Sequence, residues 1–200
     1  MKSVLISIRP KGCEKILSGE KTIEVRKSVP KCEVPFKAYI YKTKKKKWLD
    51  ICHVGEVNWI GVTADKTRIL KGVEKYGGKV IGEFVCDKVD VLFDDNGNPE
   101  DYMTDILPKI LQETALSYGE FQSYVANRAY GKSVYGWHIS QLKIYDKPKE
   151  LREFYKPCPT TEKGDCLSCD CLADNDYGGI CTNNLTRPPQ SWQYVEELEE

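Results

Sequence analysis

The sequence predicts an α+β fold, a small mixed β-barrel with flanking helices, followed by a cysteine-rich tail. Strand-like and helix-like patterns alternate in the order β-α-β-β-β-α-β-α, which favours a mixed sheet that curls around one core. The 200 residues are 40% hydrophobic and 30% charged, which is enough for one sizeable core. Near Cys158 the composition shifts to small and polar residues and cysteine. We therefore expect a domain at residues 1–155 and a tail at residues 156–200. Trp192 and Tyr194 near the end of the tail predict that it packs back on the barrel, because large aromatic side chains near a terminus usually dock on a core.

The first elements are a strand and a short helix. Residues 3–8 alternate apolar and polar side chains, as a half-buried strand does. Pro10 opens a segment whose apolar residues fall at helical spacing, and Gly19 is placed to end that helix as a C-cap.

A second strand is predicted over residues 21–26, with the sequence KTIEVR. Side chains of a strand point alternately to its two faces, so one face here is more polar and needs a pocket or solvent. The predicted faces are Lys21, Ile23 and Val25 on one side, and Thr22, Glu24 and Arg26 on the other.

Two further strands are predicted at residues 36–41 and 79–86, which are rich in β-branched and aromatic side chains. The basic run TKKKKW follows the first of them, and a run of lysines alone is typical of a solvated turn. Residues 94–99, DDNGNP, form a strong turn signal.

The second half predicts helices around one long strand. Residues 101–110 have a helical pattern that Pro108 interrupts. Ser117 is placed as the N-cap of the next helix, with Glu120 at the position expected of a capping box. Residues 133–144 return to strand, and Pro148 is expected to start a short amphipathic helix.

The charge of the chain is unevenly distributed. Residues 159–200 hold nine acidic and two basic residues, a formal charge of −7, so the other 158 residues carry +7 in a chain of net charge zero. A basic body suits an anionic partner such as nucleic acid. The sequence contains neither a signal-peptide pattern nor roughly 20 consecutive apolar residues, so we expect a monomeric cytoplasmic protein with no membrane partner.

Five of the nine cysteines lie within 24 positions of the tail. The C-x-x-C spacing lets two thiolates bind one ion, and four thiolates form a closed tetrahedral zinc site. We expect structural zinc; an iron–sulfur cluster and reduced thiols in a flexible tail are the alternatives. The predicted ligands are four of the five residues Cys158, Cys166, Cys169, Cys171 and Cys181.

Several motifs occur together in residues 1–155 in a recognisable order: SIRP before a helix, SGEKTIEVR, GKVIGEF, LSYGEFQSY, YGWHIS and KIYDKPKEL. In this order they resemble the ASCH domain of the PUA-like superfamily. The resemblance implies a β-barrel with a cleft for RNA or a nucleoside.

One bacterial branch of that family hydrolyses N4-acetylcytidine with a Lys, a Thr and a Glu. On this sequence the lysine falls on Lys21 and the glutamate on Glu120, whereas the threonine position holds Glu24. With a carboxylate in place of the hydroxyl, the nucleophile would have to be a water activated by that carboxylate.

The same region can also bind a nucleotide without chemistry, and this hypothesis ranks first. Basic side chains can hold phosphates, a carboxylate can accept from a base amino group and an aromatic ring can stack on a base. Amide hydrolysis is the second hypothesis, and a protein-interaction adaptor is the third. The candidate ligand-binding residues are Arg9, Lys21, Thr22, Glu24, Arg26, Tyr135, Trp137 and His138.

Each of these residues also has a purely structural explanation. Glu120 can act only as the capping-box acid, and Glu24 with Arg26 can form a surface ion pair. Trp137 is of a residue type more often found in a core than on a binding surface, and His138 can be an ordinary surface histidine.

Overall fold

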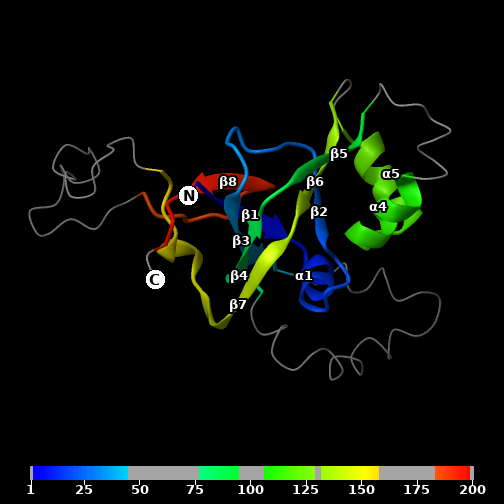
Figure 1. The fold of residues 1–200 in the computed structure, drawn as a ribbon. Coiled ribbons are helices and arrows are strands. Elements are labelled where there is room, and N and C mark those ends of the chain that lie inside the picture. Colours follow the sequence, from blue (N-terminus) through cyan, green and yellow to red (C-terminus); the bar gives the residue numbers. More distant parts are fainter. Residues whose placement is uncertain (1, 45–76, 95–105, 129–131, 158–182, 199–200) are drawn as a thin grey trace, which may run out of the picture.

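The structure is a computed structural model, and it describes residues 2–44, 77–94, 106–128, 132–157 and 183–198. Its strands form two sheets (Figure 1). The larger has the order β7-β4-β3-β1-β8, and the smaller has the order β2-β6-β5. The strands are β1 (Ser3–Ile8), β2 (Ile23–Arg26), β3 (Phe36–Lys42), β4 (Lys79–Cys86), β5 (Val89–Phe93), β6 (Val134–His138), β7 (Ser140–Lys149) and β8 (Trp192–Val195).

The helices lie at two places around the sheets. Helix α1 (Pro10–Leu17) follows β1 directly, and Pro10 stands in its first turn as the sequence predicts. Helices α4 (Leu107–Thr114) and α5 (Tyr118–Ala126) lie together beside the smaller sheet (Figure 1). In the parts of the chain that the structure describes, no helix is long and apolar enough to cross a membrane.

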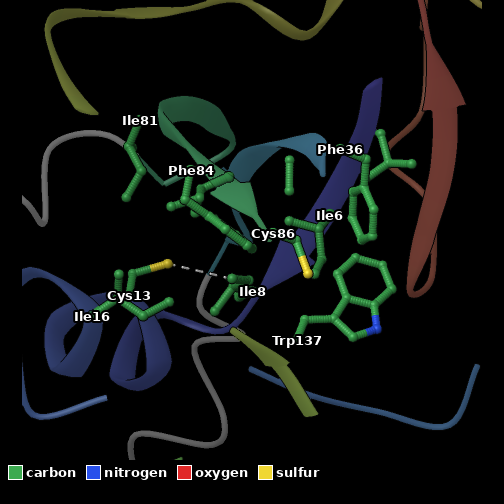
Figure 2. Packing of buried hydrophobic residues seen from close by; sticks show 12 residues of the cluster. Ile6, Ile8, Cys13, Ile16, Phe36, Ile81, Phe84, Cys86 and Trp137 are labelled. Atoms are coloured by element: carbon green, nitrogen blue, oxygen red, sulfur yellow. Dashed lines mark hydrogen bonds between the residues drawn. The ribbon is translucent and has the colours of Figure 1, made fainter. Parts of the chain in front are cut away.

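The α+β class is confirmed, but closure of the strands into a barrel is not seen. Among the described strands, no ladder of hydrogen bonds joins the larger sheet to the smaller one. Side-chain packing joins them instead: Trp137 of β6 is fully buried in a cluster built mainly from β1, β3, β4 and α1 (Figure 2). Its ring meets that of Phe36 edge to face, with centroids 5.2 Å apart. The PUA-like relationship stays a prediction.

Strand β1 is buried along its whole length rather than half-buried as its alternation suggests. It lies inside the larger sheet, parallel to β3 on one side and antiparallel to β8 on the other. Val4 and Ile6 pack into the cluster around Trp137, whereas Leu5 packs on the opposite face with Phe154 and Leu185. Residues from the C-terminal part of the chain therefore cover the second face of the sheet.

The predicted helix at Pro148 is wrong. Strand β7 continues through Pro148 to Lys149, and only the short 3₁₀ helix η5 (Leu151–Glu153) follows. Among the described strands β7 is an edge of its sheet, where a proline with no N–H is tolerated. The long strand predicted over residues 133–144 is in fact two strands, β6 and the beginning of β7, which belong to different sheets.

The last described segment, residues 183–198, returns to the larger sheet. Strand β8 pairs with β1 in antiparallel register, so that Trp192 lies opposite Ile6 and Val195 opposite Ser3. The division into a domain at 1–155 and a tail at 156–200 stays a prediction.

Candidate functional site

A cleft of about 960 Å³ lies where α1, β2, α5 and the segment before β8 meet. Strand β2 forms its floor because β2 alternates in the predicted way from Ile23 onward. Ile23 and Val25 pack against α4 and α5, and Glu24 and Arg26 face the cleft. The lining residues are Ser7, Ile8, Arg9, Lys11, Gly12, Lys15, Lys21, Glu24, Arg26, Lys27, Ser28, Thr43, Thr114, Leu116, Glu120, Ser123, Tyr124, Asn127, Gln190 and Ser191.

Three buried charged side chains form the centre of the floor. Lys21 Nζ lies 2.9 Å from Glu24 Oε2, and Arg26 Nη2 lies 2.8 Å from Glu24 Oε1. Their side chains are 7%, 4% and 10% exposed for Lys21, Glu24 and Arg26, respectively. Arg26 Nη2 also donates to the Ser7 carbonyl at 2.8 Å. Two cations against one carboxylate leave this buried group with a net charge of +1, which suits an anionic ligand.

The alternation predicted for residues 21 and 22 is reversed in the structure. Lys21 joins Glu24 in the cleft, whereas Thr22 is exposed outside it and donates through its backbone N–H to Glu113 O at 2.9 Å. Strand β2 begins only at Ile23, so the regular two-residue repeat does not extend back to these positions. Thr22 therefore cannot supply a hydroxyl beside Glu24.

Glu120 lies at the mouth of the cleft and has two structural partners. It forms the predicted capping box with Ser117, whose backbone N–H donates to Glu120 Oε2 at 2.9 Å. Its other oxygen lies 2.9 Å from Lys11 Nζ. The Ser117 N–H and the Lys11 ammonium lower the pKa of Glu120 from 4.5 to about 2. The carboxylate is therefore ionised at neutral pH and a weak base.

Basic side chains surround the cleft. Lys15 donates to the carbonyl of Ala115, and Lys27 Nζ donates to the carbonyl of Asn127 at 2.6 Å. These carbonyls end α4 and α5, where a cation is favoured by the helix dipole. Among the described lining residues, six are Lys or Arg and two are Glu, so the cleft is strongly cationic.

Solved structures decide which known fold this arrangement belongs to. The ASCH protein of Zymomonas mobilis aligns with 98% of this chain, with 89% of its own chain covered, a TM-score of 0.51 and 16% identity. Its serine-to-alanine variant gives 98% and 89% coverage, a TM-score of 0.53 and 15% identity. For its tyrosine-to-phenylalanine variant, the alignment covers 98% of this chain and 92% of the variant's chain, with a TM-score of 0.50 and 16% identity.

The chain has the ASCH fold. At this level of identity the likeness concerns the fold alone. No family model matches the sequence, and no curated protein matches it significantly. The ASCH fold was predicted from the motifs of residues 1–155, and the structural alignment supports it over nearly the whole chain.

Within this ASCH fold, four predicted ligand residues lie outside the cleft lining: Thr22, as described above, and Tyr135, Trp137 and His138. Trp137 is 0% exposed and packs between Phe36 and Trp192. Tyr135 is partly buried against the same cluster. His138 Nε2 lies 2.7 Å from Asp90 Oδ2, a bond between β6 and β5. By contrast, Arg9, Lys21, Glu24, Arg26 and Glu120 line the cleft as a group.

Sequence reasoning also missed several lining residues. Lys11 and Lys15 are four positions apart on α1, so helical spacing could have placed both on one face. Tyr124, the aromatic side chain in the cleft, lies four residues after Glu120 on α5 and could have been found in the same way. Gln190 and Ser191 reach the cleft because β8 pairs with β1. Trp192 and Tyr194 indicate that this segment docks on the core, but not that it pairs with β1.

The predicted zinc ligands, Cys158, Cys166, Cys169, Cys171 and Cys181, lie outside the described residues. Among the residues that are described, no group of three or more Cys, His, Asp or Glu side chains could hold a metal ion. Cys13, Cys32 and Cys86 are free thiols, and burial raises the pKa of Cys13 to about 12. Cys13 is therefore an inert core residue.

Proposed function

We propose that this chain binds a phosphate-bearing nucleotide, free or within single-stranded RNA, in the cationic cleft of its ASCH fold. The observation that carries the proposal is the charge of that cleft: six basic side chains against two carboxylates, around a volume of about 960 Å³. A volume of this size accommodates a nucleotide, and the excess positive charge favours its phosphate.

The cleft also offers groups suited to a base and a phosphate. Tyr124 supplies an aromatic surface for stacking. The Arg9 side chain is exposed at the cleft and has no ion pair or hydrogen bond among the described residues, so its guanidinium is free for a phosphate. Arg26 Nε is buried and has no partner in the described part of the chain, which leaves the guanidinium with unused donor capacity.

Equilibrium binding to three kinds of probe tests the proposal. Fluorescence anisotropy with labelled single-stranded RNA 12-mers, and calorimetry with the four nucleoside monophosphates and the matching nucleosides, separate RNA from free nucleotide. We expect binding to phosphate-bearing probes that weakens as salt rises and is reduced by the double substitution Arg9→Gln and Lys27→Gln. The matched control is Lys147→Gln, an exposed charge outside the cleft lining. Absence of salt-dependent binding to every probe would overturn the proposal.

A second candidate function is hydrolysis of the acetyl amide of N4-acetylcytidine. The observation in its favour is that Lys21, Glu24 and Glu120 all line the same cleft. A water activated by a carboxylate would add to the amide carbonyl, and acetate and cytidine would leave. Both carboxylates are ion-paired, however, and the lowered pKa of Glu120 makes it a weak base. Binding without turnover is therefore ranked first.

Chromatography of N4-acetylcytidine incubated with the protein distinguishes the two candidates. Hydrolysis predicts release of cytidine by the wild type and loss of that release in Glu120→Gln. The same variant should still unfold cooperatively well above the assay temperature, so that a folding defect is not mistaken for a catalytic one. If the wild type releases no cytidine, the enzymatic candidate fails and the binding proposal is unaffected.

A further inference from the structure

The turn formed by Pro189, Gln190 and Ser191 brings the C-terminal part of the chain into the cleft. Gln190 and Ser191 both line it, although they are 164 and 165 positions from Arg26. The turn is anchored on β1 by two hydrogen bonds: Ser7 Oγ donates to Pro189 O at 2.7 Å, and the Ser7 N–H donates to Ser191 O at 2.9 Å. A fixed turn of this kind can act as a wall of the binding site.

The strand that follows holds the turn in place. Trp192 begins β8 and lies opposite Ile6 of β1. Its ring packs against Trp137 with centroids 5.9 Å apart, and its indole N–H donates to Ser28 Oγ at 3.0 Å. Ser28 itself lines the cleft, so the packing of Trp192 determines the position of two parts of the wall.

Ser191 contacts the buried cation directly. Arg26 Nη1 lies 3.3 Å from Ser191 Oγ and 3.4 Å from Ser191 O, while Nη2 is occupied by Glu24 and the Ser7 carbonyl. The guanidinium is therefore held by hydrogen bonds and an ion pair from three parts of the chain: β1, β2 and the C-terminal turn. Ser191 limits the orientations of Arg26 because a guanidinium is a rigid planar fork.

Gln190 differs from the other polar side chains around it. It is exposed in the cleft and has no hydrogen-bond partner among the described residues. The Asn127 amide nitrogen, in contrast, already donates to Ser123 O at 2.8 Å. A free carboxamide offers two donors and an acceptor, which is the combination needed to read the edge of a base.

We propose that the turn Pro189–Ser191 is part of the ligand site, with Ser191 positioning Arg26 for the phosphate and Gln190 contacting the base. The inference rests on the proposed nucleotide binding. It adds that discrimination between bases depends on a segment brought in by β8, outside the residues 1–155 that contain the ASCH sequence motifs.

The test uses the full chain with Gln190→Ala, Ser191→Ala and the conservative Ser191→Thr. Thr186→Ala is the matched control, because Thr186 is exposed in the same segment and does not line the cleft. The probes are the four nucleoside monophosphates, the matching nucleosides, and single-stranded oligoadenylate, oligocytidylate and oligouridylate. Thermal unfolding of each variant verifies that it is folded.

The two substitutions should produce different losses. Gln190→Ala should reduce the ratio of affinities between the preferred and the other bases by about tenfold, and leave the salt dependence unchanged. Ser191→Ala should weaken the binding of every phosphate-bearing probe by about fivefold, because Arg26 loses the side-chain contact that orients it. The base preference should not change. Ser191→Thr should recover the wild-type affinity, and Thr186→Ala should match the wild type throughout.

Failure of this inference can be distinguished from failure of the proposed function. If the wild type binds and depends on Arg9 and Lys27, but Gln190→Ala and Ser191→Ala bind every probe as the wild type does, the inference about the turn is wrong and the proposed function stands. If the wild type binds none of the probes, both are overturned.

Discussion

Lys11 and Glu120 form an ion pair across the mouth of the cleft, with Lys11 Nζ 2.9 Å from Glu120 Oε1. The pair connects the first turn of α1 to the first turn of α5, which are 109 positions apart in the sequence. Glu120 therefore has a structural task, as capping-box acid and as ion-pair partner, in addition to any contact with a ligand. Its loss should be visible in stability as well as in binding.

Substitution of Glu120 by Gln should destabilise the protein in a pH-dependent way. The pKa of Glu120 falls from 4.5 to about 2 on folding, so the carboxylate contributes stability that is fully present above pH 4.5 and lost as the pH falls through about 2. The side chain is 40% exposed, and we expect Glu120→Gln to lower the free energy of unfolding by only about 0.5–1 kcal/mol at pH 7.

Urea unfolding of wild type and Glu120→Gln between pH 2 and pH 7 measures this effect. The difference between them should shrink below pH 4.5 and disappear near pH 2. Thr186→Ala, an exposed residue without a titratable side chain, is the control and should show no such trend. A difference that stays constant across the range would contradict the assignment of the effect to the charge.

Substitution of Glu24 by Gln should be far more damaging. Glu24 is the common partner of Lys21 and Arg26, and all three side chains are nearly buried. Removal of its charge leaves two buried cations without a counter-ion, which typically costs about 3–5 kcal/mol. In the double variant Lys21→Met and Glu24→Gln, part of the stability should return.

Chemical denaturation of the two variants and of Glu20→Gln, an exposed control in the preceding turn, tests this prediction. A loss below about 1 kcal/mol for Glu24→Gln would mean that solvent or the backbone replaces the carboxylate, and that the three charges do not act as one buried group.

The sequence predicted those parts of the ASCH fold that depend on local patterns. The capping box of Ser117 and Glu120 and the strand Lys79–Cys86 are where short-range signals place them. The grouping of Arg9, Lys21, Glu24, Arg26 and Glu120 around one cleft followed from the order of the family motifs, not from periodicity.

Other features depend on tertiary contacts that no local pattern contains. Pro148 predicts the start of a helix, but pairing of β7 with β4 keeps the chain extended there. Trp137 is a candidate ligand residue in the sequence, with a core position as its alternative, and its strand directs it into the core that joins the two sheets. Gln190 and Ser191 are part of the cleft only because β8 pairs with β1.

Burial of Trp137 predicts that its substitution affects stability and not ligand affinity. Trp137→Phe removes ring volume from a closely packed cluster and should lower the free energy of unfolding by about 1–2 kcal/mol. Tyr124→Leu, which removes the aromatic surface of the cleft, should weaken RNA binding by about tenfold instead. Anisotropy titrations on the folded variants compare the two; weaker binding by Trp137→Phe alone would contradict this assignment.

The five cysteines between residues 158 and 181 predict about one zinc ion per chain. Mass-spectrometric metal analysis of protein purified without chelators measures it. Joint replacement of Cys166 and Cys169 by Ser should abolish zinc binding, because the C-x-x-C turn supplies two of the four ligands. Cys32→Ser, a free thiol outside this cluster, is the control and should keep its zinc. Zinc-free wild type that stays metal-free after reconstitution would contradict the prediction.

Arg9 and Lys11 should contribute differently to the salt dependence of RNA binding. Arg9 has no ion pair among the described residues, so it can form one with a phosphate, and counterions are then released from the RNA. Lys11 is already neutralised in part by Glu120 and releases fewer counterions when RNA binds. Arg9→Gln should therefore reduce the slope of log K against log salt by about 0.7, and Lys11→Gln by less.

Titrations of a single-stranded RNA 12-mer at four salt concentrations give these slopes. Lys147→Gln is the control for a general loss of positive charge, because Lys147 is exposed outside the cleft lining. If Arg9→Gln and Lys147→Gln reduce the slope equally, RNA binding depends only on the overall charge of the protein. A larger reduction for Arg9→Gln than for Lys147→Gln would instead indicate a phosphate bound at Arg9 in the cleft.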